Sequence, residues 1–286
     1  MVYSTVIPIL HSEVTGQVTK RRFETTVTNA REHGDKREAA RLLAVSADGA
    51  ALWKCTTPST AQSTLSDTHY QIAAKLALGV APVSLPSNCV SCHKIDACAI
   101  DPFHPLSCSS QTGREITLRH DSIVNDLQQG TIAAGGVCVK EPTRLSPDGD
   151  RNRPDLQLVI GSQQILVDVT IRNPTSPTYY ECRGGSAEQQ LRSTVIAEQQ
   201  KTAKYSTMAK AQGAKFLPFA VEMYGGMGKS AKQLLQLISK SARDQMLMWP
   251  YQQIMQNLKG DIAISIQRGN AIAILAGYQR SIAKIC

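Results

Sequence analysis

Apolar residues recur at helical spacing in several parts of the chain, and each such stretch predicts a helix. The predicted helices cover residues 38–49, 69–78, 119–134, 186–212 and 229–248. A closing helical pair, split by Gly260 and ending near Lys284, is expected after them. Within residues 119–134, the side chains expected to face the core are Ile123, Leu127 and Ile132.

Four short runs rich in apolar and β-branched residues predict strands. They cover residues 136–142, 155–160, 164–171 and 215–224. The turn-rich residues 146–154 separate the first two runs, and Gly161-Ser162 separates the second from the third, so a meander or hairpins are expected. The order from residue 119 to 248 is therefore helix, three strands, helix, strand, helix, which predicts an α/β fold.

The composition supports a packed protein with more than one region. The 286 residues are 42% hydrophobic and 19% charged, enough for one large domain or two smaller ones. We divide the chain into residues 1–66, of unknown role, 67–112, 113–248 and a helical C-terminal extension, 249–286. The Ser/Thr-rich residues 56–68 resemble a linker near the first boundary.

Positive charge is concentrated late in the chain. The net charge is +8, yet residues 201–286 hold twelve basic and three acidic side chains, an excess of nine. Such a block predicts a polyanionic partner, nucleic acid before membrane. No apolar run approaches the roughly 18 residues of a membrane span, and residues 6–10 are too short for a signal peptide. We therefore expect a soluble, intracellular protein without a membrane partner.

A cysteine/histidine cluster lies between the second predicted helix and the third. Its spacing is Cys89-x2-Cys92 followed by His104-x3-Cys108, and thiolate and imidazole are the ligands that zinc prefers. Four such ligands predict a closed, structural zinc site. His93 and Cys98 are alternative ligands, and a group of incidental thiols in a loop is the competing interpretation.

Two carboxylates belong to neighbouring predicted strands. Asp155 opens one strand, and Asp168 lies near the end of the next. Carboxylates held together repel one another, so a pair of this kind ordinarily needs a cation, and oxygen ligands suit Mg²⁺ or Mn²⁺. Glu141 could supply a further carboxylate. An isolated Asp at a strand end is often only a turn cap, but Asp168 has apolar neighbours and a buried Asp needs a partner.

A basic group follows on the long predicted helix. Lys201, Lys204 and Tyr205 are three and four residues apart, so they share a face. A lysine there could orient an attacking water or neutralise charge on a phosphate, although a solvated helix face is the commoner meaning of such a pattern.

Together these motifs resemble a known family over residues 67–280. They are similar to the restriction-like endonuclease domain of site-specific non-LTR retrotransposons, with its Cys-Cys-His-Cys knuckle, a branch of the PD-(D/E)xK nuclease superfamily. The residues that carry the resemblance are Cys89, Cys92, His104 and Cys108, Arg119-His120-Asp121, Glu141-Pro142, Arg153-Pro154-Asp155, Asp168-Val169-Thr170 and Lys201-x2-Lys204-Tyr205, with residues 216–226 and 267–271 downstream.

The resemblance implies a restriction-endonuclease-like core over residues 113–248, preceded by a zinc knuckle. It implies catalytic Mg²⁺ or Mn²⁺ at Asp155 and Asp168 and a catalytic lysine at Lys201. His120, Asp121 and Glu141 would complete the catalytic group, and Arg119, Lys204 and Tyr205 would be auxiliary. The chain departs from the superfamily at Thr170, where lysine is usual, and the family compensates by placing the lysine on the following helix, as at Lys201.

The activity implied is a metal-dependent DNA endonuclease that nicks its target and leaves a free 3′-hydroxyl. DNA is the implied partner, the element's RNA is a second one, and the nucleus is the implied location. Two other interpretations stay open: a catalytically inactive, zinc-stabilised nucleic-acid-binding protein derived from such a nuclease, and a junction-resolving nuclease with the same core.

Overall fold

The fold is described from a computed structural model of the chain. The described residues are 3–84, 86–108, 110, 114–143, 145, 152–245 and 250–283, with side chains from residue 16 onward. Most of the predicted turn before the second strand, residues 146–151, lies outside this description. Within it, no helix is long and apolar enough to cross a membrane.

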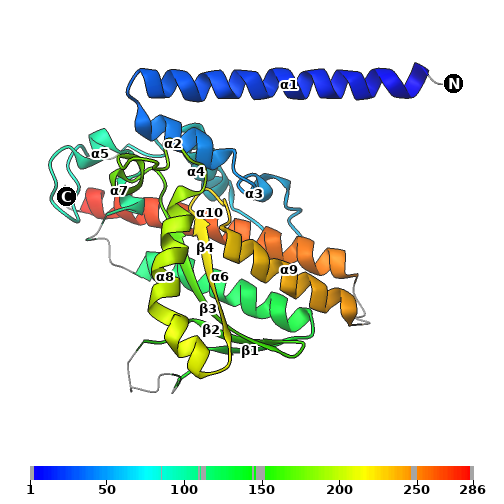
Figure 1. The fold of residues 1–286 in the computed structure, drawn as a ribbon. Coiled ribbons are helices and arrows are strands. Elements are labelled where there is room, and N and C mark those ends of the chain that lie inside the picture. The colour runs from blue at the N-terminus through cyan, green and yellow to red at the C-terminus, as the bar shows by residue number, and fades with distance from the viewer. Residues whose placement is uncertain are drawn as a thin grey trace.

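A four-stranded sheet lies at the centre of the protein, with strand order β1-β2-β3-β4 (Figure 1). The strands are β1 (Val137–Lys140), β2 (Leu156–Ile160), β3 (Gln163–Arg172) and β4 (Lys215–Glu222). β1 to β3 form the predicted antiparallel meander, and Gly161 makes the tight β2–β3 turn with a φ of 60°. β4 pairs in parallel with β3, so the chain must cross over between them.

Helices precede, connect and follow the strands. They are α1 (Tyr3–Glu32), α2 (Lys36–Val45), α3 (Leu52–Cys55), α4 (Asp67–Leu78), α5 (Ala97–Ile100), the 3₁₀ helix η1 (His104–Leu106), α6 (Arg114–Ala133), α7 (Pro177–Tyr180), α8 (Arg192–Ala211), α9 (Lys229–Asp244) and α10 (Tyr251–Ala283). The predicted order of helix, three strands, helix, strand and helix is found as α6, β1–β3, α8, β4 and α9, with the short α7 added before α8.

The central strand β3 separates two packed layers. Its odd positions Ile165, Val167 and Val169 belong to the main core, which α6, α9 and α10 complete on one side of the sheet. Its even position Leu166 packs instead against Tyr205 of α8 on the other side. Figure 1 shows α8 in front of the sheet, with α6 behind it. Because side chains alternate along a strand, Asp168 also faces α8.

Helix α6 differs in one position from the expected pattern. Ile123 and Leu127 are fully buried as predicted, but Ile132 is 50% exposed, so its predicted inward position is wrong. Five residues separate Ile132 from Leu127, a rotation of about 140° away from the buried face. Thr131 is buried in its place.

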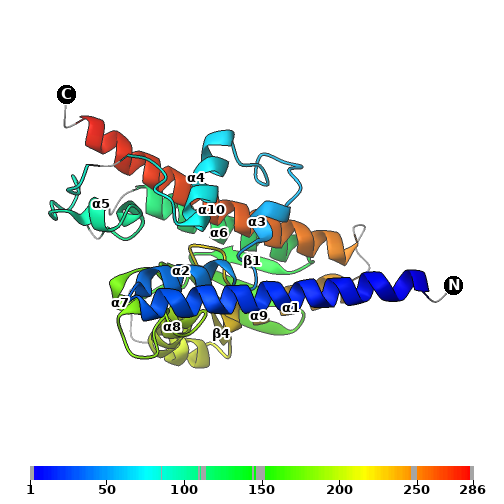
Figure 2. The ribbon, with the colours of Figure 1, turned by 90° about the horizontal axis from the view of Figure 1, so that it is seen from above.

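The predicted closing pair of helices is a single helix, α10, and the prediction of a break at Gly260 is wrong. A Cβ at Gly260 would lie 2.8 Å from Thr56 Cγ2, so the glycine allows a close contact inside a continuous helix. Figure 2 shows α10 running beneath α4 and alongside α6. Ile254, Leu258 and Ile262 of α10 belong to the main core.

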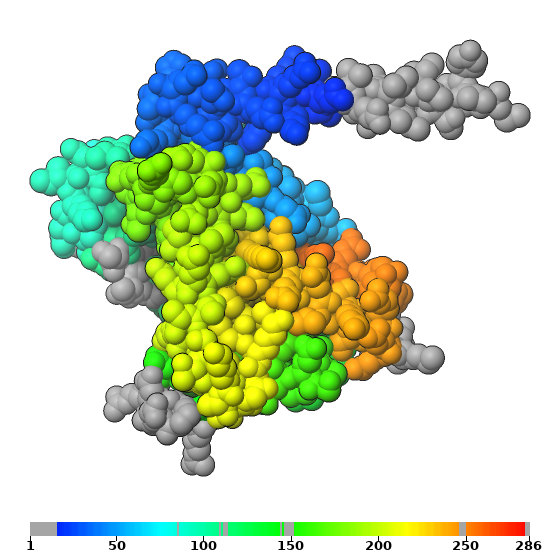
Figure 3. Space-filling model, viewed as in Figure 1, coloured from blue at the N-terminus to red at the C-terminus, as the bar shows by residue number. Residues whose placement is uncertain are grey.

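The N-terminal helix α1 was not expected from the sequence. Figure 3 shows the described part of α1 lying along the top of the molecule. Val27 is buried, and the Arg31 guanidinium donates to Ala187 O at 2.7 Å. These contacts hold the C-terminal end of α1 to the rest of the protein.

Candidate active site and metal centre

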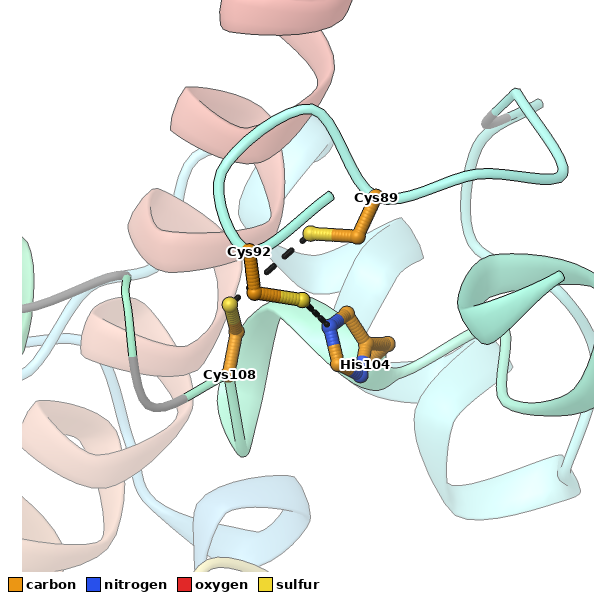
Figure 4. A group of neighbouring side chains, drawn as sticks. All are labelled: Cys89, Cys92, His104 and Cys108. Atoms are coloured by element: carbon orange, nitrogen blue, oxygen red, sulfur yellow. Dashed lines mark hydrogen bonds between the residues drawn. The ribbon is translucent and has the colours of Figure 1, made fainter. Parts of the chain in front are cut away.

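The four cysteine and histidine residues of the predicted knuckle meet in space (Figure 4). Cys89 and Cys92 lie in the turn before α5, His104 begins η1, and Cys108 follows η1. Their ligand atoms all lie within 4.8 Å of one another. Cys89 Sγ is 3.8 Å from Cys108 Sγ, and Cys92 Sγ is 3.3 Å from His104 Nε2.

These distances fit a tetrahedral metal ion. Zinc–sulfur bonds of about 2.3 Å place two thiolates about 3.8 Å apart across a tetrahedral centre. One imidazole and three thiolates form a donor set that suits zinc and excludes hard cations such as Mg²⁺. The cluster can therefore hold zinc, and with four protein ligands the ion would have a structural role.

The two alternative ligands are not part of this group. Cys98 is buried against Cys89 and Cys108, but its sulfur is not among the four converging atoms, and burial raises its thiol pKa to about 12. His93 is exposed and adopts a φ of 58° in the turn. The structure thus brings together the ligand set first predicted from the spacing.

The knuckle is joined firmly to its surroundings. Phe103 and Leu106 are buried in a cluster with Tyr224 and with Ile274 of α10. Arg37 of α2 forms an ion pair with Asp101, and its guanidinium lies 5.4 Å above the Phe103 ring. A change at the zinc ligands should therefore reach the packing around α10.

An ion pair joins Asp168 of the sheet to Lys201 of α8. Asp168 of β3 is 4% exposed, and its Oδ2 lies 2.6 Å from Lys201 Nζ of α8. The Lys201 side chain is 24% exposed, so its ammonium group borders solvent. Thr170 stays buried on the same strand. The structure thus brings two of the predicted site residues, Asp168 and Lys201, into direct contact.

Asp155, the residue directly before β2, lies opposite Asp168 of β3. The β2–β3 register pairs Leu156 with Val167, so the next pair along is Asp155 with Asp168. The Val169 N–H donates to Asp155 Oδ2 at 2.6 Å and fixes that carboxylate at the strand edge. The two predicted metal-binding residues therefore lie at one level of the sheet, where Asp155 contacts His120 of α6 and Asp168 contacts Lys201 of α8.

His120 connects α6 to this pair. Its Nε2 lies 3.1 Å from Asp155 Oδ2, and its Nδ1 lies 3.1 Å from Asp121 Oδ1. The hydrogen bond to Asp155 is the largest cause that raises the His120 pKa to about 9, and Asp121 adds to it against the opposing effect of burial. The imidazole is therefore protonated at neutral pH and forms charged hydrogen bonds with both carboxylates.

Glu141 lies at the end of β1, near the backbone of Asp155 but directed elsewhere. Its N–H donates to Asp155 O at 2.8 Å. Its carboxylate forms a 2.8 Å ion pair with Arg153, and both side chains are largely exposed. In this conformation Glu141 is a partner of Arg153 and not a third member of the Asp155–Asp168 group.

Tyr205 of α8 holds the backbone next to Asp155. It is 2% exposed, packs on Phe216 with ring centroids 5.1 Å apart, and donates its hydroxyl to Arg153 O at 3.1 Å. This hydrogen bond holds the segment that leads into Asp155. Lys204 is exposed, and its ammonium lies 4.8 Å above the Tyr205 ring. Lys201 and Lys204 therefore have different surroundings although they are close in sequence.

Arg119, predicted to be auxiliary, points away from the carboxylates. Its Nη1 donates to Asn270 Oδ1 of α10 at 2.6 Å in a buried contact. Asn270 is not among the residues predicted to act in the site. The available signal was the stretch of residues 267–271, noted only as part of the resemblance.

The chain is similar in sequence to part of a retrotransposon protein. No protein-family model matches the chain. The chain is 26% identical over 167 residues to the retrotransposable element SLACS 132 kDa protein of Trypanosoma brucei gambiense. The match covers 57% of this chain and 14% of that much longer protein. The chain is thus distantly related to a retrotransposon protein and contains a Cys/His group that can bind zinc.

Proposed function

We propose that the protein is a divalent-metal-dependent DNA endonuclease of the PD-(D/E)xK superfamily, derived from a retrotransposon, that nicks DNA. The observation that carries this proposal is the arrangement of Asp155 and Asp168 on adjacent strands with Lys201 Nζ 2.6 Å from Asp168 Oδ2. The order α6, β1–β3, α8, β4 supports a restriction-endonuclease-like core. The distant similarity to a retrotransposon protein supports the same origin.

Asp155 and Asp168 are the residues that would hold the catalytic metal. Their donor atoms are carboxylate oxygens, which suit Mg²⁺ or Mn²⁺ and differ from the sulfur-rich knuckle. When bound, such an ion lowers the pKa of a bound water and stabilises charge on the phosphate. Under this proposal the protein would hold two chemically distinct metal ions, one at the knuckle and one at the carboxylates.

The side chains around the carboxylates have separate tasks in this proposal. Lys201 is anchored by Asp168 and borders solvent, so its ammonium can contact a phosphate oxygen and neutralise the charge that develops there. His120 orients Asp155 through the 3.1 Å contact with Oδ2, and the Val169 N–H holds the same oxygen. The carboxylate is thereby fixed before substrate arrives.

DNA is the proposed partner, with element RNA as a second one and the nucleus as the location. The basic side chains of the C-terminal part provide the charge for phosphate contacts, since Lys229, Lys240 and Arg243 are exposed on α9. Binding through phosphates would be steeply weakened by salt. The zinc knuckle would stabilise the region between α4 and α6.

The test is nicking of supercoiled plasmid with Mg²⁺ or Mn²⁺, measured at equal zinc content. We expect Asp168→Ala and Lys201→Ala to lower the rate at least about 100-fold, because each removes a group that acts in the transition state. Lys210→Ala is the matched control, since that exposed lysine lies in the last turn of the same helix, away from Lys201, and it should nick like the parent.

Two outcomes would redirect the proposal. A folded, zinc-loaded parent that binds DNA without cutting linear, supercoiled or branched substrates with either metal would make the protein a nucleic-acid-binding module. A strong preference for branched over linear DNA would make it a junction-resolving nuclease with the same core.

A further inference from the structure

A buried polar network that joins Arg119 of α6 to Asn270 of α10 lies next to the proposed site and has no role in the proposed reaction. Arg119 is 6% exposed, and burial lowers its guanidinium pKa to about 10. Among the described residues no carboxylate pairs with Arg119, and its Nη1 donates to Asn270 Oδ1 at 2.6 Å. A buried cation held by an amide oxygen is costly to maintain, so its presence calls for a specific reason.

The sequence of α10 is fitted to the Arg119 side chain. A Cβ at position 269 would lie 2.4 Å from Arg119 Cβ and Cγ, so only Gly269 lets the arginine stem cross the helix. Asn270 Nδ2 donates to Met223 O at 2.7 Å, and Gln267 Nε2 donates to the same carbonyl at 3.2 Å. The Asn270 amide therefore has one orientation, with its oxygen toward α6 and its nitrogen toward the sheet.

Met223 connects this network to the strands that carry the site. It directly follows β4, and its N–H donates to Arg172 O, at the end of β3, at 2.9 Å. Asn270 therefore connects the N-terminal part of α6 to the paired strands β3 and β4. Asp168 lies on the first of these strands. The whole bridge is buried, because the side chains of Arg119, Met223 and Asn270 are all buried.

Arg119 and His120 are adjacent on α6, so their side chains leave the helix about 100° apart. Arg119 reaches α10, and His120 reaches Asp155 at 3.1 Å. A hydrogen bond of that length tolerates a shift of only a few tenths of an ångström. The orientation of α6 about its axis that lets Arg119 bond Asn270 therefore also places His120 within hydrogen-bond distance of Asp155.

We infer that Asn270 is a positioning residue, which holds Arg119 against α10 and thereby sets the orientation of α6 at which His120 contacts Asp155. The inference rests on the proposed nuclease function and gives residues 267–271 a role in it. Asn270 acts through Arg119 and His120 and does not itself touch substrate.

The first test is a double-mutant cycle on plasmid nicking. We expect Asn270→Ala to lower kcat about tenfold or more with KM for DNA within about twofold, and to have almost no further effect in a His120→Ala background. Ser281→Ala is the matched control, because it removes a buried hydrogen bond of the same helix, from Ser281 Oγ to Gly277 O, away from Asn270 and Arg119, and it should keep the parent's kcat. A full tenfold loss that persists without His120 would overturn the inference.

A second readout needs no nicking. The NMR signal of the His120 imidazole Cε1–H, assigned by its loss in His120→Ala, should shift in Asn270→Ala and stay in place in Ser281→Ala. If Asn270→Ala fails to fold, the pair Arg119→Met with Asn270→Leu replaces it, since removing both polar partners leaves no unpaired buried group. An unmoved His120 signal in folded variants overturns the inference. A shifted signal in a protein whose parent never nicks DNA overturns the proposed function alone.

Discussion

The two candidate metal centres of this protein are assembled in opposite ways. The knuckle takes its four ligands from one short segment, residues 89–108, and closes around its own turns. The acidic site takes Asp155 from the start of β2, Asp168 from β3 and Lys201 from α8, so it exists only when the sheet and its crossover helix are formed. The knuckle should therefore depend on its metal, while the acidic site should depend on the surrounding fold.

The largest expected effect is at the knuckle. Cys89→Ser should abolish zinc binding and lower the free energy of unfolding by about 3 kcal/mol or more, a modest part of the roughly 10 kcal/mol that structural zinc contributes. The loss of stability should extend beyond the knuckle, because Phe103 and Leu106 of this segment are buried against α10. Metal analysis and urea denaturation measure both quantities.

Cys55→Ser, at an exposed thiol outside the cluster, is the control and should keep zinc and stability. If Cys89→Ser kept one zinc per chain, the ligand assignment would be wrong and Cys98 would become the fourth ligand to test.

The next effect concerns the Asp168–Lys201 pair. Lys201→Met should lower the free energy of unfolding by about 2 kcal/mol, because the buried Asp168 carboxylate loses its counter-charge, reduced by the partial exposure of the lysine. Adding Asp168→Asn should restore most of that loss by removing the charge. Denaturation with urea measures each variant, and a double variant no more stable than Lys201→Met would argue against direct coupling.

A pH dependence of stability should come from His120. Its pKa is raised to about 9 in the folded protein, so its stabilising contribution is complete below the ordinary value near 6.5 and is lost as pH rises through 9. We expect about 2 kcal/mol of stability to disappear over this range without added Mg²⁺, after allowance for partial exposure.

The measurement is urea denaturation between pH 6 and 9.5 for the parent and His120→Gln. The difference between the two curves should fall with pH. Parallel curves would mean that another group is responsible.

The smallest effect is expected at Glu141. Its carboxylate is 65% exposed and paired with Arg153, an arrangement worth about 0–1 kcal/mol. Glu141→Gln should therefore leave stability nearly unchanged and reduce nicking by less than about threefold. A nicking rate that collapsed in Glu141→Gln would show that the carboxylate swings into the site, and would add β1 to the catalytic elements.

The same contrast explains what the sequence could predict. The knuckle ligands are close in the chain, so their spacing alone indicated the set that the structure brings together. The opposition of Asp155 and Asp168 followed from two adjacent strands and a tight turn. The Lys201 contact needed the resemblance to a family, because the residue belongs to another element and Thr170 occupies the usual lysine position.

Other features depended on long-range packing that no local pattern reveals. Arg119 and Asn270 lie far apart in sequence, and nothing near either residue predicts their hydrogen bond. Gly260 was expected to end a helix, but its small size serves a contact with Thr56 from a distant segment. Ile132 is one of the apolar residues of α6, but its position does not match the helical spacing of the buried residues, so its side chain is exposed.

The position of α10 along the chain has a consequence for synthesis. This helix is the last of the described elements, yet it completes the main core and supplies Asn270 to α6. A nascent chain that has exposed the knuckle, the sheet and α8 still lacks the element against which they pack. On the ribosome, the zinc segment can fold early, whereas α6 cannot settle against the sheet until α10 has emerged. Cleavage at the proposed site would therefore have to wait until α10 has been synthesised.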